Sequence, residues 1–129
     1  MIVLGHLLCG TSARFTKFER ALLVSLSGIV DDSVRDVVLA QMREINYIQR
    51  HRDDQEICFY RIKNCRVTRM RSKKFDCENE AILKKCAFTV GSEVFCAEFW
   101  LVDGNFFSIE FNKATRKLRD FEAVELFEL

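Results

Sequence analysis

The chain contains no proline, and only 5 of its 129 residues are glycine. Linkers and disordered tails are rich in these residues, so their scarcity argues against a two-domain arrangement and predicts a single domain over residues 1–129. An excess of one charge is also absent, because 20 basic residues face 19 acidic ones. No whole-molecule field therefore points to nucleic acid or to an anionic membrane. No 20-residue apolar run occurs, which excludes a membrane-spanning helix.

The N-terminus resembles a secretion signal only superficially. No charge precedes Arg14, His6 interrupts the apolar run, and Leu8 stands before Cys9 where a small residue would be needed. We therefore expect Met1 to Gly10 to form a short strand or a buried leader to the first helix, and the protein to be cytoplasmic.

Metal-binding and catalytic motifs are scarce. None of the six cysteines forms a Cys-x-x-Cys pair, and only His6 and His51 could complete a mixed site. Nucleophile elbows, phosphate-binding glycine loops and His-Glu-x-x-His helices are absent. We expect no metal, no cofactor and no familiar enzyme activity. The cysteines are expected to act as small buried hydrophobes; they are Cys9, Cys58, Cys65, Cys77, Cys86 and Cys96.

Helical periodicity dominates the first part of the chain. Thr11 and Ser12 are candidate caps for a helix that runs to about Ser27, and Gly28 offers a stop. A second helix is expected to start at Asp31, Asp32 and Ser33 and to end near His51, where Arg50 and Arg52 suit the negative end of the helix dipole. Its apolar stripe consists of Val34, Val37, Val38, Met42, Ile45 and Ile48.

Strand signals dominate the rest. Residues 57–62 form a β-type run, and a second run at 65–68 follows a turn near Lys63-Asn64. Residues 86–90, 94–102 and 106–111 are separated by Gly91-Ser92 and Asp103-Gly104, which are hairpin turn signals. The sequence therefore predicts an α+β fold, with two N-terminal helices packed on an antiparallel sheet of four to five strands that ends in a β-meander. Residues 75–83 and 113–129 fit helix or strand.

The segment from Val94 to Val102 is apolar on both faces, so we expect a central strand that is covered on both sides. The alternation across the last hairpin assigns one face to Val94, Cys96, Glu98, Trp100, Phe107, Ile109 and Phe111. The other face carries Phe95, Ala97, Phe99, Leu101 and Phe106. Two helices cover one face, and the other needs the remaining chain or a partner. Phe99, Leu101 and Phe106 are therefore candidate binding residues.

Glu98 is a carboxylate on an otherwise largely apolar face. If buried and unpaired, it would have a raised pKa and could act as a general acid or base, which makes it the one candidate catalytic residue. The alternative, which we favour, is that it lies at a sheet end or pairs with a cation. Glu93 and Glu110 are expected to be ordinary solvent-side charges.

A basic segment follows the first strand, and a nucleic-acid contact through it is the alternative function. Its seven cations are Arg61, Lys63, Arg66, Arg69, Arg71, Lys73 and Lys74. Their alternation equally fits a solvated sheet edge, and an acidic protein surface would be as good a partner as nucleic acid.

The run from Phe99 to Phe111 (FWLVDGNFFSIEF) resembles C-terminal hairpins of small bacterial α+β proteins. Some of these are immunity proteins of polymorphic toxin systems, including the SMI1/KNR4-like group. The resemblance covers the hairpin alone and transfers no functional residue. It implies a cytoplasmic domain that binds and neutralises a toxin. We therefore expect a non-catalytic protein-binding domain whose partner is a toxin or a second copy of the chain.

Overall fold

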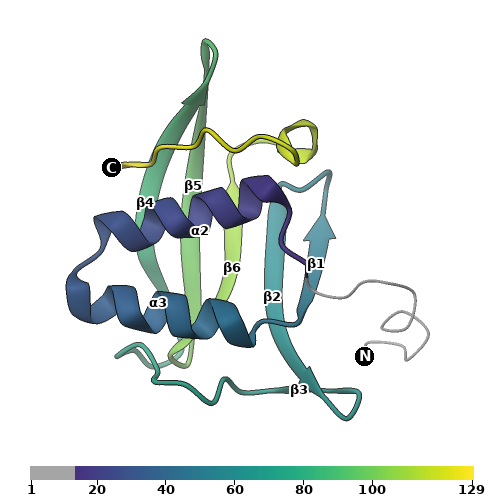
Figure 1. Ribbon diagram of the computed structural model, residues 1–129, viewed down its shortest axis with the longest axis vertical. Helices are drawn as coiled ribbons and strands as arrows, with labels where there is room; N and C mark the ends of the chain where they lie inside the picture. Colours follow the sequence, from purple (N-terminus) through teal and green to yellow (C-terminus); the bar gives the residue numbers. More distant parts are fainter. Residues whose placement is uncertain (1–13) are drawn as a thin grey trace.

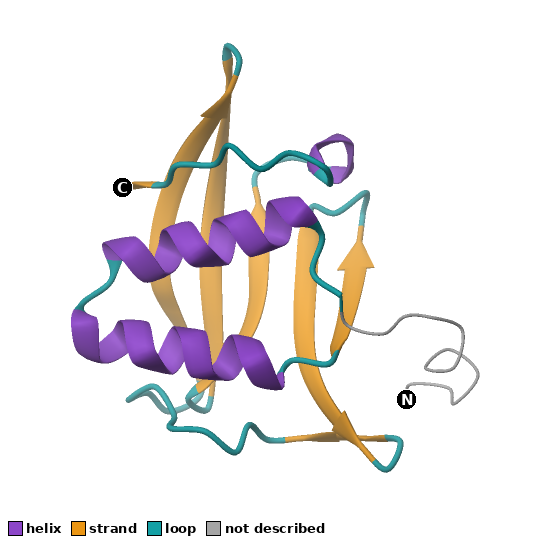
Figure 2. Ribbon diagram, in the orientation of Figure 1, coloured by secondary structure: helices purple, strands orange, loops and turns teal. Residues whose placement is uncertain are grey.

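The computed structural model describes residues 14–129, and it combines two helices with an antiparallel sheet of seven strands. Both helices lie on one side of the sheet and cross its strands (Figures 1 and 2). The expected α+β class is confirmed, with more strands than predicted. The helices are α2 (Lys17–Ile29) and α3 (Asp32–Glu44), and the strands are β1 (Tyr47–His51), β2 (Glu56–Lys63), β3 (Arg66–Thr68), β4 (Glu80–Val90), β5 (Glu93–Val102), β6 (Asn105–Phe111) and β7 (Phe127–Glu128).

The strands follow the order β1-β2-β6-β5-β4-β7, and β3 pairs with β2 off this path. The predicted meander is confirmed as β4, β5 and β6, with β5 in the interior of the sheet. Gly91, Asp103 and Gly104 have positive φ values of 61°, 49° and 79°, as tight hairpin turns require. The C-terminal segment forms a 3-10 turn, η1 (Arg116–Leu118), and then the two-residue strand β7.

Both helices differ in extent from the prediction, and Asp31 precedes α3 without making a capping hydrogen bond through its side chain. Thr16 and Glu19 form a capping box at the start of α2, whereas the expected caps Thr11 and Ser12 lie outside the described residues, as do Met1 to Gly10. The second helix ends at Glu44, so the prediction that it reaches His51 was wrong.

Residues 47–51 form an edge strand because tertiary pairing outweighs their helical spacing. The Asn46 amide group donates to the carbonyl of Ile62 at 2.8 Å and accepts from its N–H at 2.6 Å. These two bonds fix the chain against β2, and Ile48 enters the core opposite Phe59.

The core lies between the sheet and the helices. Side chains of β5 that face the helices are buried, and Phe88 and Phe95 stack with ring centroids 5.1 Å apart. Phe18 of α2 packs on Phe88 at 5.6 Å. The C-terminal segment lies along α2 on this same side (Figure 1), where the Leu126 N–H donates to the Ser25 hydroxyl at 3.0 Å. The described helices are too short to cross a membrane.

A β-bulge at Phe107 changes which side chains share a face. Leu101 pairs with Phe106 but Trp100 pairs with Ser108, so Phe107 is an extra residue in β6. Beyond the bulge, Ile109 and Phe111 point to the helix side and are buried. The prediction that they share a face with Glu98 and Trp100 was wrong, because one inserted residue reverses the alternation.

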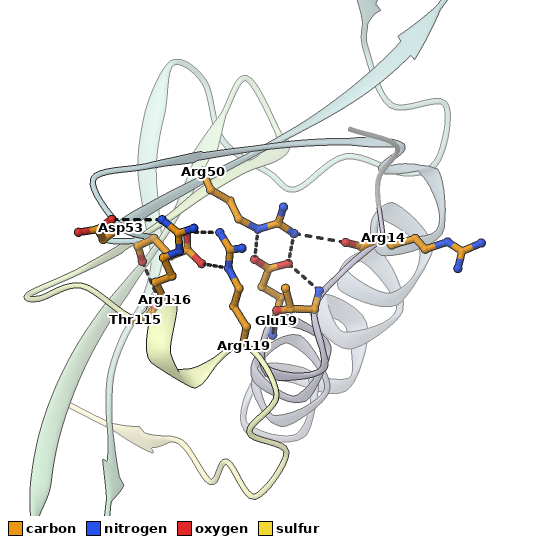
Figure 3. Close-up of polar contacts among 9 residues, drawn as sticks. Arg14, Glu19, Arg50, Asp53, Thr115, Arg116 and Arg119 are labelled. Atoms are coloured by element: carbon orange, nitrogen blue, oxygen red, sulfur yellow. Dashed lines mark hydrogen bonds and ion pairs between the residues drawn. The ribbon is translucent and has the colours of Figure 1, made fainter. Parts of the chain in front are cut away.

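Two buried carboxylates tie distant segments together near the start of α2 (Figure 3). Arg50 of β1 binds the Glu19 carboxylate through two bonds of 2.7 Å. Arg119 binds Asp54 at 2.6 and 2.9 Å, and the Thr115 hydroxyl donates to the Asp54 carbonyl at 2.7 Å. Asp53 and Asp54 lie in the turn between β1 and β2, so Arg119 ties the C-terminal segment to this hairpin.

Candidate functional site: the open face of the sheet

The side of the sheet opposite the helices is the candidate site, and we call it the open face. Its central strand alternates regularly: Phe95, Ala97, Phe99 and Leu101 are buried toward the helices, while Cys96, Glu98, Trp100 and Val102 stay half-exposed. Both helices and the C-terminal segment lie on the opposite side of the sheet from the open face, in front of the strands in Figure 1. Within residues 14–129 the open face is therefore the large surface of the sheet that remains accessible.

Three glutamates form a row across the centre of this face, which we call the acidic row. Glu110 of β6 lies directly opposite Glu56 of β2 on one side and opposite Glu98 of β5 on the other. The row ends at His51, which pairs with Glu56, and at Lys85, which pairs with Glu98. Like charges placed directly opposite one another in a sheet are destabilising, so this arrangement costs stability.

Glu110 lies in the middle of the row, between the other two carboxylates. Burial, together with the charges of Glu56 and Glu98 and a hydrogen bond shared with Glu56, raises the pKa of the Glu110 carboxyl above its usual value. A hollow of about 170 Å³ lies on one side of it, lined by Glu56, Trp100 and Ser108. A second, of about 260 Å³, lies on the other side and is lined by Cys96 and Arg52. Glu110 was expected to be an ordinary solvent-side charge; it is half-exposed on the solvent side, but it lies directly between two other carboxylates.

Aromatic side chains flank the acidic row. Tyr60 and Phe107 meet edge to face with ring centroids 6.0 Å apart, and both are half-exposed. The indole Nε1 of Trp100 is buried beside the Glu110 carboxyl, and its interaction with that carboxyl partly offsets the rise in the pKa of Glu110. Trp100, Tyr60 and Phe107 therefore border the acidic row with half-exposed aromatic surface that a bound molecule could contact.

His51, Glu56 and Cys58 present one nitrogen, one oxygen and one sulfur atom on the β1–β2 part of this face. These ligand atoms all lie within 4.8 Å of one another. Burial, with the charges of Glu56 and Glu110, raises the pKa of the Cys58 thiol to about 11. Burial, with the neighbouring Cys58, raises that of Tyr60 to about 12. This trio is the set of described residues whose donor atoms suit a metal ion.

The predicted apolar binding residues are not on this surface. Phe99, Leu101 and Phe106 are exposed by only 0%, 3% and 2%, because they face the helices. They form part of the core and cannot contact a partner. β5 lies in the interior of the sheet as expected, but within residues 14–129 only its helix side is covered, so the expectation of a strand covered on both sides was wrong. The helices cover the side to which these candidate binding residues had been assigned.

Glu98 does lie on the open face, and it has the character of a paired surface charge. Its side chain is 37% exposed and lies 3.6 Å from the Lys85 ammonium group. This matches the favoured expectation of a carboxylate paired with a cation. Glu98 is therefore not the buried, unpaired carboxylate that the catalytic interpretation needed.

The basic segment runs from the end of β2 through β3 into the following loop. Arg61 is engaged, because it donates to the Thr68 hydroxyl at 2.7 Å and lies 3.6 Å from Glu44. Lys74 donates to the Met70 carbonyl, and burial lowers the pKa of its ammonium group. The remaining cations are exposed; they are Lys63, Arg66, Arg69, Arg71 and Lys73.

The acidic row is the feature that sequence reasoning missed. Glu98 and Glu110 lie on the β5–β6 hairpin, where the bulge brings them to one face, but Glu56 is on β2, 54 positions before Glu110. The only local signal is that each glutamate lies at a position of its strand where the alternation of apolar and polar residues places a polar one.

No family model matches this chain, and neither a curated protein nor a solved structure shows significant similarity to it.

Proposed function

We propose that this protein is a non-catalytic protein-binding domain that uses its open face to bind a cationic segment of another protein. The observation that carries the proposal is the acidic row, set among half-exposed aromatic side chains on a face that no described helix covers. We include toxin neutralisation in the proposal, because an immunity protein acts by covering a surface and needs no catalysis.

The chemistry of the face favours arginine and lysine side chains. Lys85 neutralises only Glu98, and no ion pair among the described residues involves Glu56 or Glu110. A guanidinium group can bind such carboxylates through paired hydrogen bonds and stack on an aromatic ring. Tryptophan and tyrosine are also the residues that contribute most often to binding energy at protein interfaces. A basic segment with apolar side chains would therefore complement this surface.

A second copy of the chain fits the same face less well. Two open faces brought together would oppose one acidic row to another, and like charges across an interface cost several kcal/mol. A different protein with a basic surface would avoid this repulsion between two acidic rows. We therefore favour a different protein over self-association.

The proposal is tested with two synthetic peptides of equal length, one alternating arginine and valine and the other alternating glutamate and valine. Backbone amide shifts are followed by NMR as each peptide is added. The cationic peptide should shift residues around Trp100, Phe107 and Glu110, whereas the acidic peptide should not. Glu98→Lys and Trp100→Ala should each weaken binding at least tenfold.

The matched control is Glu122→Lys, which reverses an exposed charge outside the open face and should leave the affinity unchanged. If Glu122→Lys and Glu98→Lys weakened peptide binding equally, the net charge of the protein would explain the effect, and the proposal would be wrong. Absence of binding by the cationic peptide, or a homodimer in sedimentation that depends on the open face, would also defeat it.

Nucleic-acid binding through the basic segment is the second candidate, because five of its cations are exposed at one end of the sheet. Phosphate contacts release counterions, so such binding must weaken steeply as salt rises. A titration with single-stranded RNA and duplex DNA at low and moderate salt tests it. Lack of affinity at low salt rules this function out, and salt-sensitive affinity that Arg66→Ala and Arg69→Ala reduce would favour it over the protein-binding role.

A further inference from the structure

The turn between β1 and β2 places three different metal-binding atoms side by side. Arg52, Asp53 and Asp54 all have positive φ, which reverses the chain so that His51 faces Glu56. Cys58 lies two residues beyond Glu56 and therefore on the same face of the sheet. The imidazole nitrogen, carboxylate oxygen and thiol sulfur come within 4.8 Å of one another as a result.

This turn is held in place by contacts outside the hairpin. Arg119 binds the Asp54 carboxylate, and the carbonyl of Asp53 accepts the N–H groups of Thr115 and Arg116 at 3.1 and 3.0 Å (Figure 3). The N–H of Phe111 donates to the Gln55 carbonyl at 2.8 Å. The C-terminal segment and β6 thus fix the position of His51 relative to β2. A site whose backbone is already held in place loses little free energy to reorganisation when a ligand binds.

The donor set matches a zinc-type ion. Thiolate, imidazole and carboxylate together suit Zn²⁺, whereas Mg²⁺ and Ca²⁺ prefer oxygen alone. Tetrahedral zinc with ordinary bond lengths separates its ligand atoms by about 3.3 to 3.8 Å. The atoms need to approach by about 1 Å. His51 is exposed and Glu56 half-exposed, so both can rotate toward the buried Cys58.

The surroundings also favour a divalent cation. Glu110 lies directly opposite Glu56 in the pairing of β2 with β6, so it stands next to the trio. Glu98 stands next to Glu110 in the row. Lys85, which is the cation paired with the row, lies at its opposite end. A bound dication would offset the repulsion among these carboxylates at the place where it is greatest.

We propose that His51, Glu56 and Cys58 bind a zinc-type divalent cation on the outer face of the β1–β2 hairpin, with Glu110 as the adjacent carboxylate that can complete the coordination. The site shares Glu56 and Glu110 with the acidic row, but binding of the cation can be measured whether or not the open face binds a protein. It has three protein ligands from two adjacent strands, and its fourth position is open to Glu110 or to water.

The test uses Co²⁺ as a spectroscopic probe on the full-length, reduced protein after removal of metals with a chelator. Cobalt bound to a thiolate gives a near-ultraviolet charge-transfer band, and tetrahedral cobalt gives strong visible bands. We expect one equivalent to bind with both features and Zn²⁺ to displace it. Cys58→Ser should abolish the charge-transfer band, and His51→Ala and Glu56→Gln should each weaken binding at least tenfold.

Matched controls come from the same face. Cys96→Ser removes a half-buried thiol on β5, and Glu98→Gln removes a carboxylate of the acidic row outside the trio; both should retain the band and affinity within threefold of the parent. Because His51 is exposed, its variant decides the result even if Cys58→Ser fails to fold. Lack of a cobalt–thiolate band in the parent, or unchanged affinity in His51→Ala, would overturn the proposal.

Discussion

At the residue scale, the carboxylate of Glu19 shows how single contacts hold this fold together. Its side chain is 1% exposed, and it binds both Arg50 and the Thr16 N–H. Burying a charge is costly unless it is paired, so the contact stabilises the fold mainly by removing a penalty. It joins the start of α2 to the edge strand β1.

Replacement of the cation in this pair gives the first prediction. Arg50→Ala leaves the Glu19 carboxylate buried with the Thr16 N–H as its remaining hydrogen-bond donor, so we expect a loss of about 3 kcal/mol in the free energy of unfolding. Urea denaturation followed by circular dichroism measures it. Lys17→Ala is the control, because Lys17 forms an exposed pair 3.8 Å from Glu122. That change should stay within about 0.5 kcal/mol, and an equally small effect of Arg50→Ala would contradict the prediction.

The role of Arg50 could not be found from local sequence. Its position after an apolar stripe suggests a cation at a helix end, and the structure instead places it on β1, 31 residues from its partner. The helical spacing of Ile45 and Ile48 is real, but Ile48 reaches the core equally well from a strand. A short segment whose pattern fits two structures is decided by its partners.

At the scale of elements, the turns were the most predictable features because their chemistry is local. Gly104 has a φ of 79°, and a Cβ added there would lie 2.7 Å from the Phe75 carbonyl oxygen. Gly91 has a φ of 61° with no atom within 4 Å of such a Cβ. The two hairpin glycines therefore share a backbone conformation and differ in their surroundings.

Alanine substitutions at three glycines separate these effects. Gly91→Ala should cost about 1 kcal/mol, the price of the left-handed conformation alone. Gly104→Ala adds a collision with backbone and should cost about 2 to 3 kcal/mol. Gly28 is exposed within α2 and meets nothing, so Gly28→Ala should stabilise by about 0.5 to 1 kcal/mol. Thermal and urea denaturation test the order, and equal losses at Gly91 and Gly104 would contradict it.

The bulge at Phe107 marks where element-level prediction failed. The hairpin turn correctly set the pairing of Val102 with Asn105. The extra residue Phe107, two positions after Asn105, then reversed the faces of Ile109 and Glu110. A bulge depends on the fit of the whole sheet to its helices, and the sequence of β6 alone carries no clear sign of it.

At the scale of the molecule, the fold class followed from local patterns, but the candidate site did not. Alternation and turn residues were enough to indicate helices on an antiparallel sheet. The acidic row depends on β6 lying between β2 and β5, which no local pattern specifies. The donor trio likewise depends on a turn that pairs His51 with Glu56 where a helix end had been expected.

The stability of the whole molecule should fall at alkaline pH, in part through Cys86. This residue lies on β4, fully buried toward the helices. Burial raises the pKa of the Cys86 thiol from 9.0 to about 11; the negative charge of Glu128 adds to this rise, and the positive charge of Lys84 partly opposes it. The folded protein thus keeps a proton that the unfolded chain loses near pH 9. The resulting stabilisation is complete below that pH and is lost as pH rises toward 11.

Comparison of the parent with Cys86→Ala isolates this contribution. The variant should be less stable at pH 7, because it leaves a small cavity, but it should lose about 1 to 2 kcal/mol less than the parent between pH 8.5 and 11. Denaturation by urea across that range provides the measurement. Cys65→Ala removes an exposed thiol and should follow the parent. Parallel alkaline losses in the parent and Cys86→Ala would show that the buried thiol ionises as readily in the folded protein as in the unfolded chain, contrary to its place in the core.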